Sequence, residues 1–258
     1  MKLSRRIFLG SAAALLPRGA VARTPDIPLI DLHVHAEGEM TVERAARIAQ
    51  ERGVKIGIAE HGGCGLEMGS DESLLRYVER LAPHPVFKGM QAEGHDWMRC
   101  FSREALAKLD FILADALVFP EKDGRHVRLW TQEAKITDKQ DFMDRYVDFN
   151  VQVISLEPIH IFANPTFLPE AIAGEYDALW TKERMWKVIE AAAKRKVAIE
   201  INSLYRIPSE VFIRMAKEAG VRFTFGSNSH GDGIGRLDYC LEMARRCGLA
   251  RADFFVPG

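Results

Sequence analysis

Seven short apolar runs, separated by segments with helical periodicity, most strongly limit how this chain can fold. The runs are rich in Val, Ile, Leu, Phe and Ala, and they span residues 27–32, 54–59, 86–92, 110–118, 159–164, 197–202 and 222–227. Almost continuous apolar strands are typical of a parallel sheet that is covered on both faces. Strands that alternate with helices indicate repeated βαβ units. We therefore expect an α/β fold built as a single parallel, TIM-like (βα)7 barrel.

Several segments between the runs begin with residues that favour helix N-caps. We expect amphipathic helices over residues 41–52, 71–81, 138–151, 182–194, 209–219 and 237–246. Thr41, Asp71 and Ser209 stand where a side-chain oxygen can accept a hydrogen bond from the first helical turn. No linker rich in Pro, Gly or Ser interrupts residues 23–258, so we expect one domain there. The charged stretch 121–137 is expected to form a loop or lid over one end of the barrel.

The first 22 residues resemble an export signal rather than part of the fold. The sequence SRRIFL at residues 4–9 resembles a twin-arginine motif, and a short apolar run follows it. Ala20-Val21-Ala22 has the small-x-small pattern of a cleavage site. The apolar run is too short to cross a bilayer, so we expect no stable membrane insertion. We expect residues 1–22 to engage the twin-arginine export machinery and the barrel domain, 23–258, to be periplasmic or secreted.

Composition narrows the expected partners. Charged residues make up 28% of the chain and the formal net charge is −1, which gives no electrostatic reason to bind nucleic acid. A small-molecule substrate is therefore expected, and the composition does not indicate an oligomeric state. The four cysteines lack zinc-finger spacing, and although an exported protein can form disulfides, we expect most of them to be buried free thiols. They are Cys64, Cys100, Cys240 and Cys247.

Side chains that bind metals recur at the carboxyl ends of the expected strands, where barrel enzymes place their active sites. His33 and His35 follow the first run one residue apart, and this spacing puts them on one face of an extended strand. The later strand ends carry Glu60, His61, Glu93, His95, Asp115, Asn164, Glu200, Asn202, Asn228 and His230. Each has an ordinary structural explanation, but packing does not require a polar side chain at every strand end. The pattern therefore predicts a metal site at this end of the barrel.

These motifs resemble the PHP family, named for polymerase and histidinol phosphatase, over residues 27–249. The matching segments are His33-Val34-His35, His61, Gly89–Glu93 and Ser227–His230. The resemblance implies a single distorted (βα)7 barrel of the PHP type with two or three metal ions, which hydrolyses a phosphate ester with metal-activated water. It also implies that His33 and His35 bind one ion, that Glu93 bridges two, and that His61 binds a third with His230. The segment ANPTFLP at residues 163–169 further resembles an exported branch of PHP-like proteins.

Three positions depart from the family pattern. Leu117 stands where the family usually has a histidine, and Asp115, on the same side, substitutes for it. Asn164 replaces another histidine, and Asn228 replaces an aspartate. Glu37 takes the place of an acidic or histidine ligand after the first pair. Because a neutral asparagine is a weaker ligand for transition metals, we expect one or two divalent ions, Zn, Mn or Fe.

The expected site has three sets of residues. The metal ligands are His33, His35, Glu37, His61, Glu93, Asp115, Asn164, Asn228 and His230. The catalytic residues are Glu93, Asp115 and His230. The substrate contacts are Glu200, Asn202 and Arg206. The guanidinium of Arg206 suits an anionic substrate because it donates paired hydrogen bonds to oxyanions.

Three functions stay open at this point. The first is an exported metal-dependent hydrolase that acts on a phosphoester. The second is an amide or lactone hydrolase, since metal-activated water serves those bonds equally well. The third is a non-catalytic barrel that binds a metal or a ligand, which the residues Leu117, Asn164 and Asn228 favour.

Overall fold

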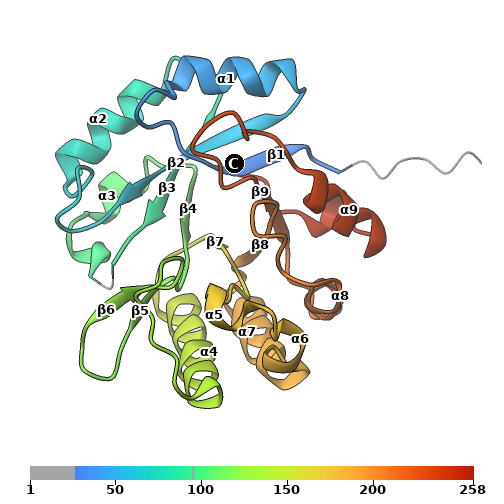
Figure 1. The fold of residues 1–258 in the computed structure, drawn as a ribbon. Coiled ribbons are helices and arrows are strands. Elements are labelled where there is room, and N and C mark those ends of the chain that lie inside the picture. The colour runs from blue at the N-terminus through green and yellow to red at the C-terminus, as the bar shows by residue number, and fades with distance from the viewer. Residues whose placement is uncertain (1–26, 95) are drawn as a thin grey trace, which may run out of the picture.

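The computed structural model describes residues 27–94 and 96–258, so the expected signal over residues 1–22 and His95 lie outside the described residues. Seven parallel strands form a closed barrel in the order β1-β2-β3-β4-β7-β8-β9, and the helices lie outside it (Figure 1). The strands are β1 Ile30–Val34, β2 Lys55–Gly62, β3 Phe87–Ala92, β4 Phe111–Ala114, β7 Ile161–Phe162, β8 Ala198–Asn202 and β9 Phe223–Gly226. The expected α/β barrel of seven strands is confirmed.

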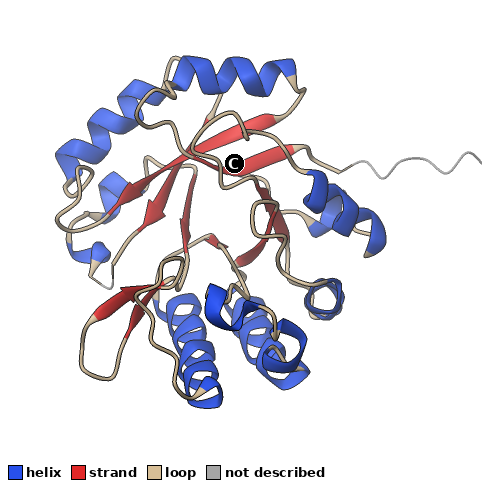
Figure 2. Cartoon of the chain, viewed as in Figure 1, coloured by secondary structure: helices blue, strands red, loops and turns tan. Residues whose placement is uncertain are grey.

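The six expected helices are present, and Figure 2 shows them around the strands. They are α1 Val42–Glu51, α2 Asp71–Leu81, α4 Lys139–Leu156, α7 Lys182–Arg195, α8 Glu210–Glu218 and α9 Asp238–Arg246. Thr41 and Ser209 cap α1 and α8 as expected. The cap of α2 is Ser70 rather than Asp71, whose carboxylate accepts a hydrogen bond from the backbone of Ser102 at 2.7 Å. Short helices that the sequence analysis did not predict are α3 Arg103–Leu106, α5 Glu170–Ala173, α6 Tyr176–Leu179, η1 Trp97–Arg99 and η2 Arg251–Asp253.

The expected strand over residues 110–118 is divided. Strand β4 ends at Ala114, and the carboxylate of Asp115 then accepts a hydrogen bond from the backbone N–H of Leu117 at 2.9 Å, which turns the chain. The chain continues as β5 Val118–Pro120, which pairs antiparallel with β6 His126–Arg128. The charged stretch therefore begins as a hairpin, which lies beside α4 in Figure 1.

An apolar plug fills one part of the barrel interior, and the polar site lies in the remaining part. Phe111 lies at its centre, and a Cβ on Gly89 would stand 2.2 Å from the Phe111 ring. Residues that alternate inward further along the strands are polar, for example Gln91 after Gly89 in β3. The plug consists of Ile30, Leu32, Ala59, Phe111, Leu113, Ile161, Ala163 and Ala198. Polar side chains therefore gather towards the carboxyl ends of the strands.

A disulfide joins two of the loops at this end. Cys64, in the loop after β2, is bonded to Cys100, which follows η1. The expectation of free thiols is wrong for this pair, because folding brings two loops 36 residues apart in sequence to a Cα separation of 5.6 Å. Cys240 and Cys247 are free and buried, as expected. Among the described residues, no helix is long and apolar enough to cross a membrane.

Candidate metal centre

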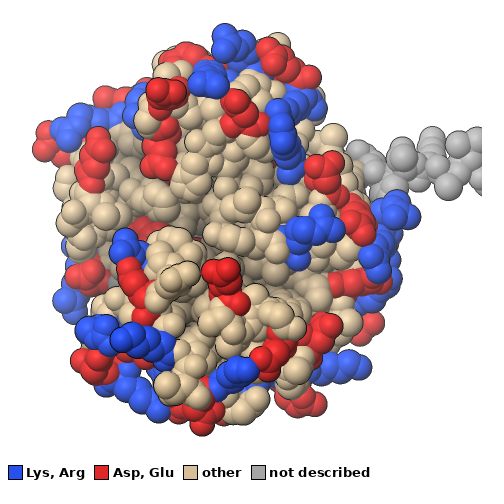
Figure 3. Space-filling view, viewed as in Figure 1, with Lys and Arg blue, Asp and Glu red and all other residues tan. Residues whose placement is uncertain are grey.

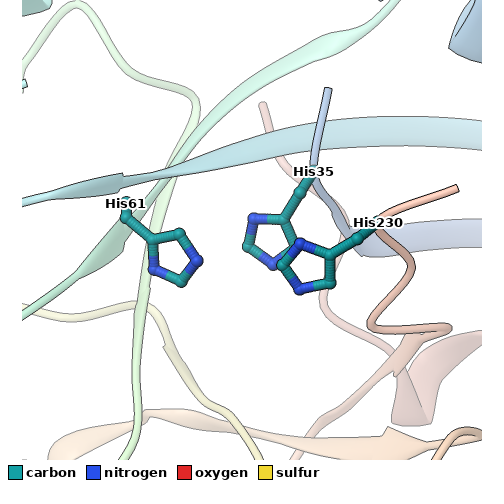
Figure 4. A group of neighbouring side chains, drawn as sticks. All are labelled: His35, His61 and His230. Carbon is teal, nitrogen blue, oxygen red and sulfur yellow. The ribbon is translucent and has the colours of Figure 1, made fainter. Parts of the chain in front are cut away.

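Three histidines from different strand ends converge at the carboxyl end of the barrel (Figure 4). His35 follows β1, His61 lies near the end of β2, and His230 follows β9. One ring nitrogen from each lies within 4.8 Å of the others. The ring of His35 stacks against both partners, with centroid distances of 4.7 Å to His61 and 4.2 Å to His230. We refer to these three residues as the histidine triad.

Backbone pairing fixes the triad from both sides. The N–H of His35 donates to the carbonyl of Ser229 at 2.9 Å, so His230 is held beside β1. The N–H of Glu93 donates to the carbonyl of Gly62 at 2.9 Å, so Glu93 lies beside the end of β2 that carries His61. The buried carboxylate of Asp31 also accepts backbone hydrogen bonds from Ser227 and Gly235 at 2.9 and 2.8 Å, which ties β1 to the loop after β9.

His35 has the environment of a metal ligand. Both of its ring nitrogens are buried, and neither has a hydrogen-bond partner among the described residues. An unsatisfied buried polar atom costs about 1–3 kcal/mol, so a purely structural role is unfavourable. Burial, and then the neighbouring imidazoles of His33, His61 and His230, lower the pKa of His35 well below its usual range. The side chain is therefore neutral, which is the form that binds a metal ion, and the triad fits one divalent ion.

Two carboxylates orient the outer imidazoles of the triad. Oε1 of Glu93 lies 2.9 Å from Nδ1 of His61, and Oε1 of Glu37 lies 2.5 Å from Nδ1 of His230. In both histidines this leaves Nε2 for a metal, as in the carboxylate–histidine pairs of metal sites. Burial opposes protonation of His61, but the hydrogen bond and charge of Glu93 outweigh it and raise the pKa of His61.

A second group of polar residues lies deeper in the barrel, and we call it the buried polar cluster. It consists of His33, Gln91, Asp115, Asn164, Glu200, Asn202 and Asn228. Nδ1 of His33 lies 2.6 Å from Glu200 Oε1, and Nε2 lies 2.9 Å from Gln91 Oε1. Both acceptors are oxygens, so this arrangement suits a doubly protonated imidazole. Burial opposes protonation of His33, but the Glu200 carboxylate outweighs burial and raises the pKa of His33. In return, the charge of His33 lowers the pKa of Glu200.

The remaining members of the cluster satisfy one another. Nδ2 of Asn164 donates to Asp115 Oδ2 at 2.7 Å, and the Asn164 backbone N–H donates to Glu200 Oε2 at 2.7 Å. Oδ1 of Asn164 accepts from Asn202 at 2.9 Å and from Asn228 at 3.3 Å. Burial and then the charge of Glu93 raise the pKa of Asp115 to about 6. The cluster is therefore a closed hydrogen-bond network.

The backbone gives a second reason for asparagine at two of these positions. Asn164 and Asn228 have φ angles of 46° and 48°, in the left-handed region. Asparagine adopts this region more readily than most residues with a side chain. Both positions therefore combine a backbone requirement with a polar side chain that points into the network.

The structure divides the expected ligands between these two groups. His35, His61 and His230 form the triad, and Glu37 and Glu93 hold two of its imidazoles. The other expected ligands lie in the buried polar cluster with Glu200 and Asn202; they are His33, Asp115, Asn164 and Asn228. Gln91 was not among the expected site residues, although it lies two residues before Glu93 and bridges His33 to the carboxylates of Glu93 and Asp115.

Arg206 lies apart from the triad. Its guanidinium stacks over the Tyr239 ring at 4.8 Å and pairs with Glu242 at 3.5 Å. It lines a cleft of about 380 Å³ with Phe167 and Tyr205, and no triad residue lines that cleft.

A larger cleft, of about 780 Å³, adjoins the triad, since His61 and Glu37 are among its lining residues. The face shown in Figure 3 carries acidic and basic side chains side by side around its rim.

Comparison with known proteins adds information about the fold. No protein-family model matches the chain, and no curated protein matches its sequence. The structure resembles histidinol phosphate phosphatase from Lactococcus lactis subsp. lactis, complexed with zinc, L-histidinol and phosphate. The TM-score is 0.63 at 15% identity, and the match covers 87% of this chain and 95% of that chain. A chain in an archaeal ribonuclease P complex with mature tRNA gives a TM-score of 0.43 at 14% identity, covering 84% of this chain and 89% of that chain. The first similarity shows a shared fold, and the TM-score of the second is too low to show one.

Proposed function

We propose that this protein is an exported metal-dependent hydrolase that uses activated water to cleave a phosphate ester. The proposal rests mainly on His35, whose two buried ring nitrogens have no hydrogen-bond partner among the described residues and whose ring lies between two further imidazoles. The similarity of the fold to a phosphatase that was crystallised with zinc and phosphate supports the phosphoester over amides and lactones. The PHP-like motifs of the sequence agree with this choice.

The triad would hold one ion, and the residues around it divide the remaining tasks. Such an ion supplies Lewis acidity, which lowers the pKa of water and offsets charge on a phosphoryl group. Glu93 and Glu37 fix the ring orientations of His61 and His230. Asp115, whose pKa is about 6, is suited to accept a proton near neutral pH. His33 cannot offer a nitrogen without breaking its bond to Glu200 or Gln91, so we propose one tightly bound ion rather than two or three.

Metal content and turnover together test this proposal. Chelator-treated protein is titrated with Zn²⁺ and Mn²⁺, and the reconstituted protein is assayed against phosphomonoesters, phosphodiesters, lactones and amides. We expect one tight ion per chain and metal-dependent release of phosphate, both lost in His35→Ala and kept in His126→Ala, an exposed histidine of β6. Wild-type protein that binds no metal above trace would overturn the proposal. Hydrolysis of only amides or lactones would change the substrate class.

We also propose export by the twin-arginine route. The motif at residues 4–9 supports it, and so does the Cys64–Cys100 disulfide, since disulfides persist mainly in oxidising compartments. Cell fractionation of the wild type and of an Arg5→Lys/Arg6→Lys variant tests this directly. We expect the wild type in the periplasm or medium and the variant in the cytoplasm. An equal distribution of the two proteins would contradict twin-arginine export.

A further inference from the structure

The 780 Å³ cleft beside the triad has the size of a small-molecule site. One wall is the segment after β1, with Ala36 and Thr41, and another is the loop after β2, with Leu66 and Met68. The third wall is helix α2. Because His61 also lines the cleft, a ligand that reacts at the triad would extend its remaining atoms into this space.

Helix α2 presents one polar face to the cleft. Ser73, Arg76, Tyr77 and Arg80 all line it, and their spacing of three or four residues places them on one side of the helix. Tyr77 anchors this face to the barrel, because its buried hydroxyl lies 2.9 Å from the Ile58 carbonyl and 2.8 Å from the Gly89 carbonyl. The position of the two arginines relative to the triad is thereby fixed by the strands.

Most charges in the cleft already have partners within the protein. Glu37 is bonded to His230, and Glu43 pairs with His84 at 3.2 Å. Glu60 accepts a hydrogen bond from the backbone of Ala36 at 2.6 Å.

The two arginines differ in this respect. Arg76 pairs with Glu72 at 2.5 Å, and both side chains are largely exposed. The guanidinium of Arg80 stacks over the Tyr77 ring at 5.5 Å and forms no close ion pair in the described parts of the chain. The carboxylates of Glu43 and Glu60 interact with its charge at longer range. Glu60 and Glu67 are the acidic residues of the cleft for which no ion pair is seen within the described residues, and Glu67 lies on the exposed loop after β2.

We propose that this cleft binds the unreacted part of the substrate and that Arg80 selects a substrate with a second anionic group. This inference rests on the proposed function. A guanidinium recognises carboxylate and phosphate through paired hydrogen bonds, and the Tyr77 ring orders it before binding. Arg76 lies one helical turn away, and its exposed pair with Glu72 is weak enough to be exchanged for a ligand. Arg80 is the stronger candidate for recognition than Glu67, because it stacks on a residue anchored to the barrel, whereas Glu67 lies on an exposed loop.

Three phosphonates that cannot be hydrolysed test this selection independently of turnover. Methylphosphonate has no second ionised group, phosphonoacetate adds a carboxylate, and aminomethylphosphonate adds an ammonium group. Calorimetric titration of the zinc-loaded wild type should show phosphonoacetate binding about tenfold or more tightly than methylphosphonate. Arg80→Ala should abolish that preference and Arg80→Lys should keep part of it. Arg103→Ala, on α3 and outside the cleft, should leave it unchanged.

The outcomes separate this inference from the proposed function. A protein that hydrolyses phosphomonoesters but binds the three phosphonates equally would overturn the inference and leave the function intact. A preference for phosphonoacetate that survives in Arg80→Ala would also overturn it, because the carboxylate would then be bound elsewhere. Tighter binding of aminomethylphosphonate, lost in Glu67→Gln, would assign the cleft to cations instead. A preference that depends on Arg80, in a protein with no hydrolase activity, would support the anion site and contradict the proposed function.

Discussion

The histidine triad and the buried polar cluster lie next to each other, yet their neighbouring histidines, His35 and His33, are in opposite hydrogen-bonding states. The ring centroids of His33 and His35 are only 5.2 Å apart. His33 is bonded through both ring nitrogens, whereas neither nitrogen of His35 has a partner among the described residues. No buried side-chain nitrogen or oxygen of the cluster is left unbonded within the described residues. Two histidines one residue apart are thus prepared for different tasks.

This contrast indicates which of the two groups contributes to folding stability and which contributes to ligand binding. A closed network of buried hydrogen bonds rigidifies the barrel end, because each member loses its partners if another is removed. His35 does the reverse, since its two ring nitrogens, unpartnered among the described residues, are an unfavourable feature of the folded protein that a ligand can relieve. We therefore expect substitutions in the cluster to change folding stability, and substitutions in the triad to change metal affinity.

The largest effect is expected from Glu200→Ala. It removes one partner of the buried His33–Glu200 pair, and an unpaired buried charge typically destabilises a protein by about 3–5 kcal/mol. Urea denaturation of metal-free protein measures the change. Glu242→Ala is the matched control, because its pairs with Arg206 and Arg246 are exposed and should contribute less than about 1 kcal/mol. If Glu200→Ala does not fold, the isosteric Glu200→Gln gives the comparison. Losses of equal size in Glu200→Ala and Glu242→Ala would refute the assignment of the cluster to stability.

His35→Ala should produce the next largest effect, this time on metal binding. Loss of one of three ligands should weaken zinc binding by roughly 100-fold, while metal-free stability changes less than in Glu200→Ala. Competition with a fluorescent chelator measures the affinity, and His126→Ala is again the control. Unchanged zinc affinity in His35→Ala would show that the triad is not the metal site.

Most of the fold could be predicted from local sequence patterns. Each of the seven strands is an apolar run, each of the six long helices has an apolar face, and all of these helices but α9 begin at a capping Ser, Thr or Asp, so local signals were sufficient. The division of the strand at Asp115 could not be predicted in the same way. It depends on a side-chain hydrogen bond to the backbone of Leu117, which an apolar pattern does not reveal.

The candidate site was predictable in place but not in detail. Parallel strands bring their carboxyl ends together, so the residue types at those ends were sufficient to indicate a polar site. The division into triad and cluster depends on long-range geometry. The pairing of β1 with β2 shifts in register between Asp31 and Val34, and the neighbours of His33 and His35 come from β3, β8 and the loop after β9. The Cys64–Cys100 pairing depends on tertiary structure for the same reason.

Gln91→Glu would break the contrast by making the cluster resemble a metal site. The Gln91 amide now donates to Glu93 at 3.2 Å and to Asp115 at 3.4 Å, so a carboxylate there would face two others. We expect a loss of about 1–2 kcal/mol in the metal-free protein from this repulsion and from the lost hydrogen bonds. Added Zn²⁺ or Mn²⁺ should restore the stability, and elemental analysis should find a second ion. A stability loss that no metal restores would mean that the closed network, rather than the missing charge, excludes the second ion.

The smallest expected effect is a pair of opposite pH dependences. The pKa of His33 is raised above its ordinary value of 6.5 and that of Glu200 is lowered below 4.5. The folded protein therefore gains stability from His33 fully below pH 6.5, and loses it as the pH rises through the raised pKa. Protons compete with metal at His61, whose pKa Glu93 raises, so zinc affinity should instead increase as the pH rises through that value.

Urea denaturation of metal-free wild type and His33→Gln at pH 5.5, 7.5 and 9.5 measures the first dependence. The difference in free energy of unfolding between the two proteins should shrink towards alkaline pH, by about 1.4 kcal/mol for each pH unit by which the pKa of His33 is raised. Glu93→Ala should move the midpoint of zinc binding to lower pH without changing the stability profile of the His33–Glu200 pair. Two profiles that rise together would show that the triad and the cluster titrate as one unit, and the division between binding and stability would fail.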